Sequence, residues 1–302
     1  MSAIVMQRER DTEHRSTIRP SHRRSDRRAV LAFLAPWTVG LILLTLGPLA
    51  FSLYLSFTHY NLFSAPRWAG LSNYGSMFRD PSFFASARVT ATYVGISVPC
   101  VLGGALAVAL LLNGKLRGLA FYRTLFYIPT LLGSTVAIAF VWTEVFSSSG
   151  VVNRVLSLVG ITGPAWLGDP STALYTLITL NVWTFGTVMV IFLAGLRQIP
   201  RPLYEAAQVD GAGRLSVFRN ITFPMLSPVV FFNGILTAIT AFQSFTPAYI
   251  ISSGTGGPVQ STLLYSLYLY QQGFVQYNMG YAIARRCSEP PQRCRKTKRP
   301  AR

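Results

Sequence analysis

The residues whose types and spacing could do chemistry lie in one stretch, EAAQVDGAGRLSVFRNITFP, which runs from Glu205 to Pro224. Its first half consists of small residues around two carboxylates, Glu205 and Asp210, and the stretch separates two strongly apolar regions. Small side chains let the backbone of another protein approach closely, and a carboxylate can form a charge-assisted contact with an Arg or Lys of that protein. The stretch therefore predicts a docking site for a partner protein. The alternative is a loop that is rich in Ala and Gly by chance.

Catalytic and metal-binding patterns are not visible elsewhere in the sequence. The three histidines, His14, His22 and His59, lack the spacing of metal ligands, and there is no recognisable Ser/His/Asp arrangement. The segment GKL at 114–116 lacks the hydroxyl residue and the preceding Gly-rich loop of an ATP-binding motif. We therefore expect no metal, no cofactor and no ATP hydrolysis by this chain.

The elements that position the docking stretch are contained in five long apolar intervals of the sequence. The chain is 51% hydrophobic and 12% charged, whereas soluble proteins carry about 25% charged residues. A membrane-spanning helix needs about 20 mostly apolar residues, and the intervals are long enough. We therefore predict an all-α fold, a polytopic membrane helical bundle with five evident transmembrane helices. The intervals lie between Arg28 and Arg67, between Arg88 and Lys115, between Arg123 and Glu144, between Asp169 and Arg197, and from Pro224 to Ile251.

The net charge of +17 is concentrated at the two ends of the chain, with eight arginines in residues 1–28 and eight basic residues in 285–302. A nucleic-acid interface would instead spread basic residues over a folded face, so no nucleic-acid partner is expected. Cytoplasmic loops are enriched in Lys and Arg. The N-terminal segment and the second and fourth loops carry fifteen basic residues, and the other loops up to Ala284 carry four. The N-terminus and the docking stretch are therefore predicted to be cytoplasmic.

The uncharged segment after the fifth interval is rich in Gln, Tyr, Ser and Asn, whose polar groups are costly in hydrocarbon. We predict an interfacial helix over Ser261–Gln272, with Tyr265, Tyr268 and Tyr270 near the lipid headgroups, and no sixth span.

The C-terminal tail, RRCSEPPQRCRKTKRPAR, conflicts with this topology because five spans from a cytoplasmic start place its basic residues outside. One interpretation is a disordered basic tail. Our hypothesis is out-of-frame translation after Ala284 that removes a further span. An intact reading frame at the locus, with no apolar run encoded downstream in the other frames, would contradict it. We thus predict a basic cytoplasmic segment at 1–28, a transmembrane domain at 29–284 and an anomalous tail at 285–302.

The docking stretch is expected to form two short helices. Leu203–Val209 can be helical, and Gly211 is expected to end that helix. Gly213 permits a second bend, and Arg214–Phe223 is expected to form another short helix that meets the fifth span at Pro224. The result is a helix–turn–helix along the cytoplasmic surface.

This loop resembles the EAA loop of the permease subunits of bacterial ABC importers, whose pattern is EAA, three residues, Gly, nine residues, Ile, any residue, Leu and Pro. The matching positions are Glu205, Ala206, Ala207, Gly211, Ile221 and Pro224. Phe223 replaces Leu, which is a mild apolar change. The runs FYRTLFYIPTLL and GTGGPVQSTLLYSLYLYQQGF are also similar to the carbohydrate branch, akin to maltose and glycerol-3-phosphate permeases.

The resemblance implies a multi-pass protein of the bacterial inner membrane that forms half of the path for a sugar or sugar-like solute. It implies a second permease subunit, two ATP-binding subunits that hydrolyse ATP, and an external solute-binding protein as partners. It also implies that the loop docks in a cleft of the ATPase and carries its closing motion to the spans. The residues assigned to this coupling are Glu205, Ala206, Ala207, Asp210, Gly211, Gly213, Ile221 and Pro224.

Other interpretations stay open. They are an ABC permease for phosphate, peptides or amino acids, a secondary transporter or channel that needs no ATPase, and a non-functional truncated permease, since the family normally has at least six spans.

Polar residues within the spans are candidates for the solute path, because intramembrane polar groups tend to face the bundle interior. They are Asn181, Thr184, Asn233, Gln243 and Ser244. The alternative for each is a hydrogen bond to a neighbouring helix. Glu144 and Asp169, which flank the third external loop, are expected to be solvated.

Overall fold

The computed structural model describes residues 23–61, 63–114, 118–132 and 136–277. Contacts divide the chain into two compact units, the first ending at Tyr54 and the second beginning at Leu55. The predicted tail at 285–302, the boundary at Ala284 and most of the predicted segment at 1–28 lie outside the described residues.

The first unit is one apolar helical run. It consists of α2 (Arg23–Gly40), the π-helical segment η1 (Leu41–Leu46) and most of α3 (Gly47–Ser56). From Val30 to Ser56 the run is long and apolar enough to cross a membrane, and no part of its most apolar window is buried. A helix that is apolar on all sides needs a non-aqueous environment, as expected of the first predicted span.

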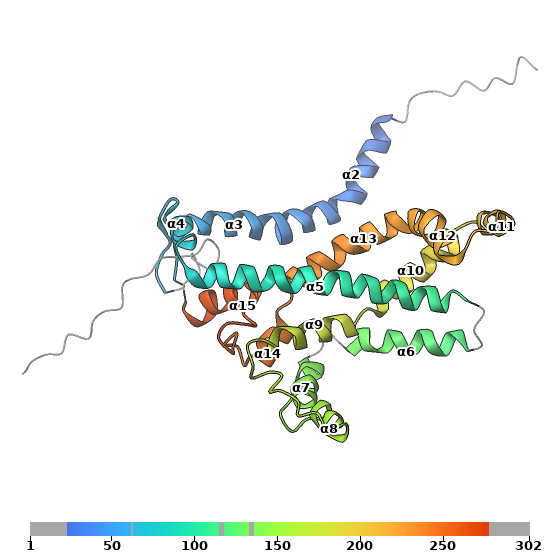
Figure 1. The fold of residues 1–302 in the computed structure, drawn as a ribbon. Coiled ribbons are helices and arrows are strands. Elements are labelled where there is room, and N and C mark those ends of the chain that lie inside the picture. The colour runs from blue at the N-terminus through green and yellow to red at the C-terminus, as the bar shows by residue number, and fades with distance from the viewer. Residues whose placement is uncertain (1–22, 62, 115–117, 133–135, 278–302) are drawn as a thin grey trace, which may run out of the picture. The chain divides into compact units, whose positions relative to one another are not determined.

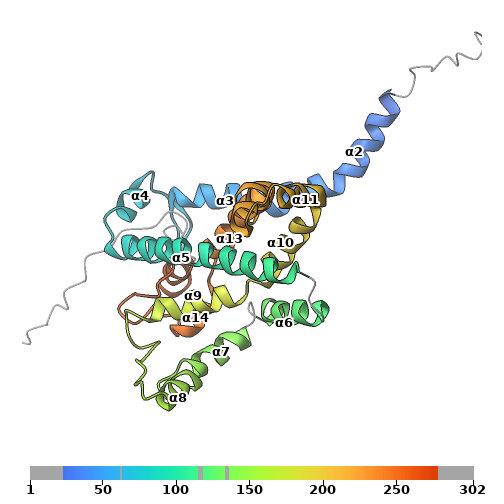
Figure 2. The same cartoon turned by 45° about the vertical axis from the view of Figure 1, so that its right-hand side comes forward.

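The second unit contains the remaining elements and is drawn in Figures 1 and 2. In chain order these are β1 (Thr58–His59), β2 (Arg67–Trp68), α4 (Ser72–Met77), α5 (Pro81–Leu112), α6 (Leu119–Leu132), α7 (Val136–Val145), α8 (Val151–Leu158), α9 (Ala173–Trp183), α10 (Gly186–Gln198), α11 (Arg201–Val209), α12 (Arg214–Val217), η2 (Phe218–Thr222), α13 (Phe223–Phe242), α14 (Thr246–Ile251), α15 (Tyr265–Tyr270) and η3 (Gln271–Val275). The strands β1 and β2 pair antiparallel, with Thr58 opposite Trp68. All other elements are helical, which agrees with the predicted all-α class.

The long helix α5 organises the second unit, because α9, α10, α13 and α15 all pack against it. It begins sharply at Pro81, where Asp80 Oδ1 accepts a hydrogen bond of 2.6 Å from the N–H of Ser82. Its buried residues recur every three or four positions, which is the spacing of one helix face. They are Ser86, Thr90, Tyr93, Ser97, Val101, Ala105, Ala109 and Leu112. Most are small, and small residues allow close helix packing in membranes.

Two apolar clusters form the core along this helix. One contains Tyr93 of α5, Leu177 of α9 and Leu267 of α15. The other contains Ala105 and Ala109 of α5, together with side chains of α10 and α13 such as Met189, Phe192 and Leu226. In the second cluster, the small side chains of Ala105 and Ala109 leave room for Met189 and Phe192 of α10, which are therefore fully buried.

These helices give three candidate spans, or five if each of two bent helix pairs is counted as one span. Three are long and apolar enough by themselves, at Val30–Ser56, Pro81–Leu112 and Arg214–Ile251, and the last of them has a break at residues 243–245 between α13 and α14. Two more are bent pairs, α6 with α7 and α9 with α10, whose bends are 101° and 45°. The five predicted spans coincide with these five regions. The bend between α9 and α10 follows from a break at Thr184 and Phe185, where the backbone leaves the helical hydrogen-bond pattern.

The predicted interfacial helix is only partly correct. The helical segment covers Tyr265–Val275 as α15 and η3, and residues 261–264 are not helical. Tyr268, which we expected near the headgroups, is buried at 2% exposure, and its hydroxyl donates to Asp80 Oδ2 at 3.3 Å. The sequence reasoning missed this because a tyrosine can be buried when its hydroxyl finds a partner.

Candidate functional site

The first arm of the docking loop is α11, which contains the helix expected at Leu203–Val209. Pro200 precedes it in extended conformation and Pro202 lies in its first turn, where no N–H is needed. Asp210 ends the helix, and Gly211 follows with a φ of +69°. Only glycine adopts this conformation without strain. Gly211 therefore turns the chain out of α11.

The second arm differs from the prediction. Gly213 has an ordinary φ of −70° and caps α12, which continues through η2 into α13. We expected a separate helix that meets the span at Pro224, but the chain stays helical across this point. Pro224 lies in the first turn of α13, and the π-helical segment η2 precedes it. Since proline is tolerated in a first turn, the second arm is a direct extension of the fifth span.

The loop presents small and apolar groups to the outside. Glu205, Ala206, Asp210, Gly211, Gly213 and Pro224 are exposed, whereas Ala207 is buried and Ile221 is half-buried. Two large apolar side chains that we did not predict are also exposed, Val209 at 88% and Leu215 at 80%. The amphipathic spacing of α11 could have indicated Val209, because in a helix the residue two positions after the buried Ala207 lies on the opposite face.

Side-chain packing ties this loop to the spans. Tyr204 and Ile221 pack against the apolar cluster that α5, α10 and α13 share. The hydroxyls of Tyr204 and Thr222 lie 3.1 Å apart and connect α11 to η2. In Figures 1 and 2, α11 and α12 lie at the end of the second unit opposite α4 and α15. The loop is therefore packed directly against the core formed by α5, α10 and α13.

The structure places the five solute-path candidates at three separate locations. Asn181 and Thr184 lie at the break between α9 and α10, Asn233 lies in the middle of α13, and Gln243 and Ser244 follow α13.

The surroundings of these candidates differ. Asn233 is buried and donates to the carbonyl of Val229 at 2.8 Å, within its own helix. Asn181 Nδ2 is buried and has no hydrogen-bond partner among the described residues. Buried polar groups without a partner are rare in folded proteins, so Asn181 is the candidate with an unused donor.

The hinge at α9–α10 is braced by α6. The carbonyl of Thr184 accepts a hydrogen bond from the hydroxyl of Thr130 at 3.2 Å. A Cβ on Gly186 would lie 2.5 Å from the carbonyl oxygen of Phe126 and 2.5 Å from Thr130 Oγ1. Glycine is therefore required where α10 crosses α6, directly beside Asn181 and Thr184.

Metal binding finds no support in the described ranges, which contain no group of three or more His, Cys, Asp or Glu residues that could hold an ion.

The helical bundle and its docking loop define a membrane permease. Residues 117–284 match the family described as "Binding-protein-dependent transport system inner membrane component". The chain is 50% identical over 263 residues to the "Probable ABC transporter permease protein YesP" of Bacillus subtilis (strain 168), covering 86% of this chain and 85% of that protein. It therefore belongs to the family of ABC importer permeases, which are transporter subunits.

Two further similarities support this assignment. The chain is 36% identical over 247 residues to the lactose transport system permease protein LacF of Rhizobium radiobacter, covering 80% of this chain and 82% of that protein. It also shares the fold of a chain in the crystal structure of a bacterial alginate ABC transporter in complex with an alginate pentasaccharide-bound periplasmic protein. That match has a TM-score of 0.74 at 22% identity and covers 88% of this chain and 90% of the other.

Proposed function

We propose that this chain forms half of the translocation path of an ATP-driven importer for a sugar or sugar-like solute. The other half is a second permease subunit, and the solute arrives on an external solute-binding protein. Two ATP-binding subunits hydrolyse ATP and act on the chain through residues 205–224. The protein resides in the bacterial inner membrane with its N-terminus in the cytoplasm, in agreement with the distribution of basic residues.

The docking loop carries this proposal. Its outer surface combines Glu205, exposed small residues and the exposed side chains of Val209 and Leu215. An apolar patch with one charge suits a protein cleft that offers a cation. Its inner surface is anchored in the core by Tyr204 and Ile221. A partner that binds the outer surface of the loop can thus favour one packing arrangement of the spans.

Alternating access then follows from differential binding. A ligand shifts a two-state equilibrium only by as much as it binds one state better than the other. If the ATP-bound ATPase pair binds the loop best in the outward-open packing, nucleotide drives that packing. The Gly186 crossing and the α9–α10 hinge are elements that could hold two arrangements.

The assignment of a sugar rests on the relatives. LacF is named for lactose and the structural neighbour for alginate. In the present chain, hydroxyl and amide side chains such as Asn181 and Thr184 provide hydrogen-bonding groups for a neutral polyol. Uptake of phosphate, peptides or amino acids, with no uptake of any saccharide, would contradict the sugar assignment.

Charge reversal at the loop tests the coupling. The variant Glu205→Lys places a cation against the proposed cation of the ATPase, so ATP-driven uptake should be abolished while insertion in the membrane is unchanged. The matched control is Thr162→Lys, which adds the same side chain on an exposed loop between α8 and α9. The readouts are uptake of labelled oligosaccharides and the ATP hydrolysis that co-purifies with the tagged chain.

Two results would overturn the proposal. Full uptake by Glu205→Lys would exclude the docking role of this loop. Uptake that persists when ATP is depleted and the membrane gradient is kept would indicate a secondary transporter.

A further inference from the structure

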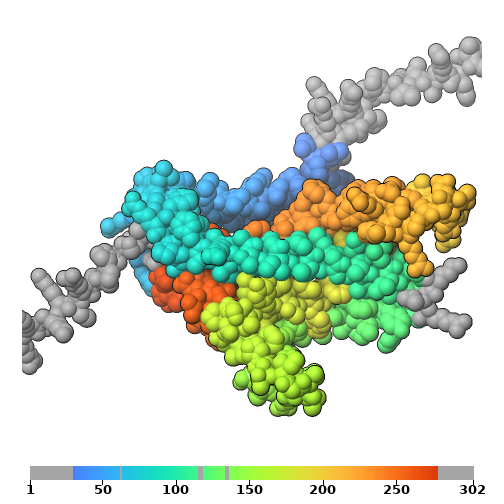
Figure 3. All heavy atoms as spheres, in the orientation of Figure 1, coloured from blue at the N-terminus to red at the C-terminus, as the bar shows by residue number. Residues whose placement is uncertain are grey.

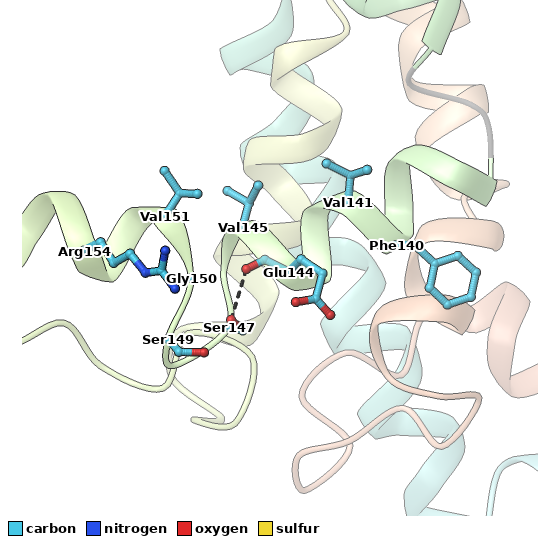
Figure 4. A pocket seen from close by; sticks show the side chains of 9 residues that line it. All are labelled: Phe140, Val141, Glu144, Val145, Ser147, Ser149, Gly150, Val151 and Arg154. Carbon is cyan, nitrogen blue, oxygen red and sulfur yellow. Dashed lines mark hydrogen bonds between the residues drawn. The ribbon is translucent and has the colours of Figure 1, made fainter.

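A pocket of about 480 Å³ lies between α7 and α8, on a part of the chain that the docking loop does not involve. Figure 4 shows the side chains that surround it. Its charged groups are Glu144 of α7 and Arg154 of α8, and its apolar wall is formed by Phe140, Val141, Val145 and Val151. A volume of this size is typical of a site for a small molecule or a headgroup, roughly 300–1,000 Å³.

The two charged groups of the pocket are available to a ligand. Glu144 and Arg154 are exposed, and neither side chain makes an ion pair or a hydrogen bond with another described residue. The carboxylate of Asp169, which does not line the pocket, is already engaged. Its Oδ1 accepts hydrogen bonds from the N–H of Ser171 at 2.8 Å and from the hydroxyl of Ser171 at 2.7 Å. These bonds hold the pKa of Asp169 below its ordinary value.

The turn and the hydrogen bonds around α8 hold the pocket open. Gly150 makes the turn from α7 into α8, and a Cβ there would lie 2.4 Å from the carbonyl oxygen of Val145. The amide of Asn153 donates to the carbonyls of Ser148 and Pro164 at 3.0 and 3.3 Å. Its Oδ1 accepts from Trp166 Nε1 at 2.7 Å. The wall formed by α8 is therefore preorganised, which reduces the entropy cost of binding.

The side chains around the pocket suit a membrane surface. Large apolar residues of α8 are exposed on one side, namely Val151, Val155 and Leu158. The lobe also contains Trp142 and Trp166, which both contact Phe146 at ring-centroid distances of 5.1 and 6.1 Å. Tryptophan is enriched where membranes meet water. Figure 3 shows this lobe, drawn in lime green, projecting from the rest of the second unit.

We propose that this pocket binds a zwitterionic phospholipid with a primary amine in its headgroup, of the phosphatidylethanolamine type. Arg154 contacts the phosphate and Glu144 contacts the ammonium group. The glycerol and the first acyl carbons lie on the apolar wall beside Val141 and Val151. Two opposite charges beside an apolar wall match a lipid that carries both charges on an apolar body.

The apolar wall favours a membrane lipid over a soluble molecule with the same headgroup. A free headgroup would leave the apolar side chains of Phe140 and Val141, which are exposed at 60% and 52%, uncovered. The acyl chains of a lipid cover both side chains, which removes their apolar surface from water. A protein partner that covered this pocket would have to bury both Glu144 and Arg154, which is costly unless each charge is paired.

The test is lipid retention by the full-length chain, purified in mild detergent and measured by native mass spectrometry. The probes are dioleoyl phosphatidylethanolamine, dioleoyl phosphatidylglycerol and glycerophosphoethanolamine, which has no acyl chains. The expected order of affinity places phosphatidylethanolamine first. Since uptake is not measured, failure here leaves the proposed transport function untouched.

Three variants separate the contacts. Arg154→Gln should weaken both lipids by about tenfold, the effect of losing a charge-assisted contact. Glu144→Gln should weaken phosphatidylethanolamine by a similar factor and leave phosphatidylglycerol unweakened. The matched control Arg88→Gln removes an exposed arginine of α5 outside the pocket, and it should change neither lipid.

The proposal is overturned by any of three outcomes. The first is equal affinity of the parent chain for both lipids. The second is a failure of the variants to discriminate, in which Arg88→Gln loses as much affinity as Arg154→Gln or Glu144→Gln loses none. The third is competition by glycerophosphoethanolamine as strong as that by the lipid, which would mean that the headgroup alone is recognised.

Discussion

The hydroxyls of Tyr204 and Thr222 lie 3.1 Å apart and link α11 to the beginning of the fifth span. Thr222 is buried, and Tyr204 is packed against the core of α5, α10 and α13. Under the proposed coupling role, the pair connects the outer surface of the loop to the spans.

Breaking the Tyr204–Thr222 contact should weaken coupling without preventing folding. Tyr204→Phe and Thr222→Val each remove one hydroxyl, and a double-mutant cycle on thermal unfolding should give an interaction of about 0.5–1.5 kcal/mol. ATP-driven uptake should fall in both variants, while ATP hydrolysis is retained. The matched control is Ser216→Ala, which breaks the exposed bond from Asn220 to Ser216 in the same loop and should have little effect. Additive unfolding energies would contradict the contact.

The turn at Gly211 should be more sensitive to substitution than the bend at Gly213. Both sites have open space around a Cβ, but Gly211 has a φ of +69° and Gly213 a φ of −70°. Gly211→Ala should cost about 1–2 kcal/mol because of the left-handed backbone, and Gly211→Asn should cost less. Gly213→Ala should cost less than Gly211→Ala, because its φ is ordinary and only its position as the N-cap of α12 disfavours alanine. Thermal unfolding of the purified chain measures this, and equal effects at the two glycines would disprove it.

Replacing Asn181, whose side-chain donor is unpaired, should reduce solute uptake without reducing stability. Because Asn181 Nδ2 is buried without a partner, Asn181→Leu should keep or raise the melting temperature, as an unsatisfied polar group costs about 1–3 kcal/mol. Solute uptake should fall if this donor faces the path. Asn233→Leu is the comparison, since Asn233 is paired with the carbonyl of Val229. Destabilisation by Asn181→Leu would show that the amide is structural.

The crossing of α6 and α10 should tolerate no side chain at Gly186. A Cβ there would lie 2.5 Å from the backbone oxygen of Phe126, so Gly186→Ala should destabilise by about 1–3 kcal/mol through overpacking. Gly103→Ala in α5 is the matched control because nothing lies within 4 Å of its Cβ position. That change should be neutral or stabilising, since alanine has the higher helix propensity. A shared loss of stability, measured by thermal unfolding in detergent, would contradict the crossing.

The spans and the docking loop could be predicted from local properties of the sequence. A run such as that after Arg28 can only be stable where no water surrounds it, and the first arm of the loop follows from short-range rules for Pro and Gly. The second arm was predicted less well. Whether η2 continues into α13 depends on how Ile221 and Thr222 pack against distant helices, and short-range rules carry no information about that.

The sequence by itself determined the apolar spans, the small-faced loop between Glu205 and Pro224 and the family to which the chain belongs. All three depend on residue type and on spacing along the chain. Only the tertiary structure decided that Tyr268 is buried with its hydroxyl donating to Asp80, that Asn181 keeps an unused donor while Asn233 does not, and that Glu144 and Arg154 face one pocket. The Tyr268–Asp80 contact joins residues 188 positions apart, the surroundings of Asn181 depend on which helices pack around it, and the pocket depends on the tight turn at Gly150, so residue spacing alone does not reveal them.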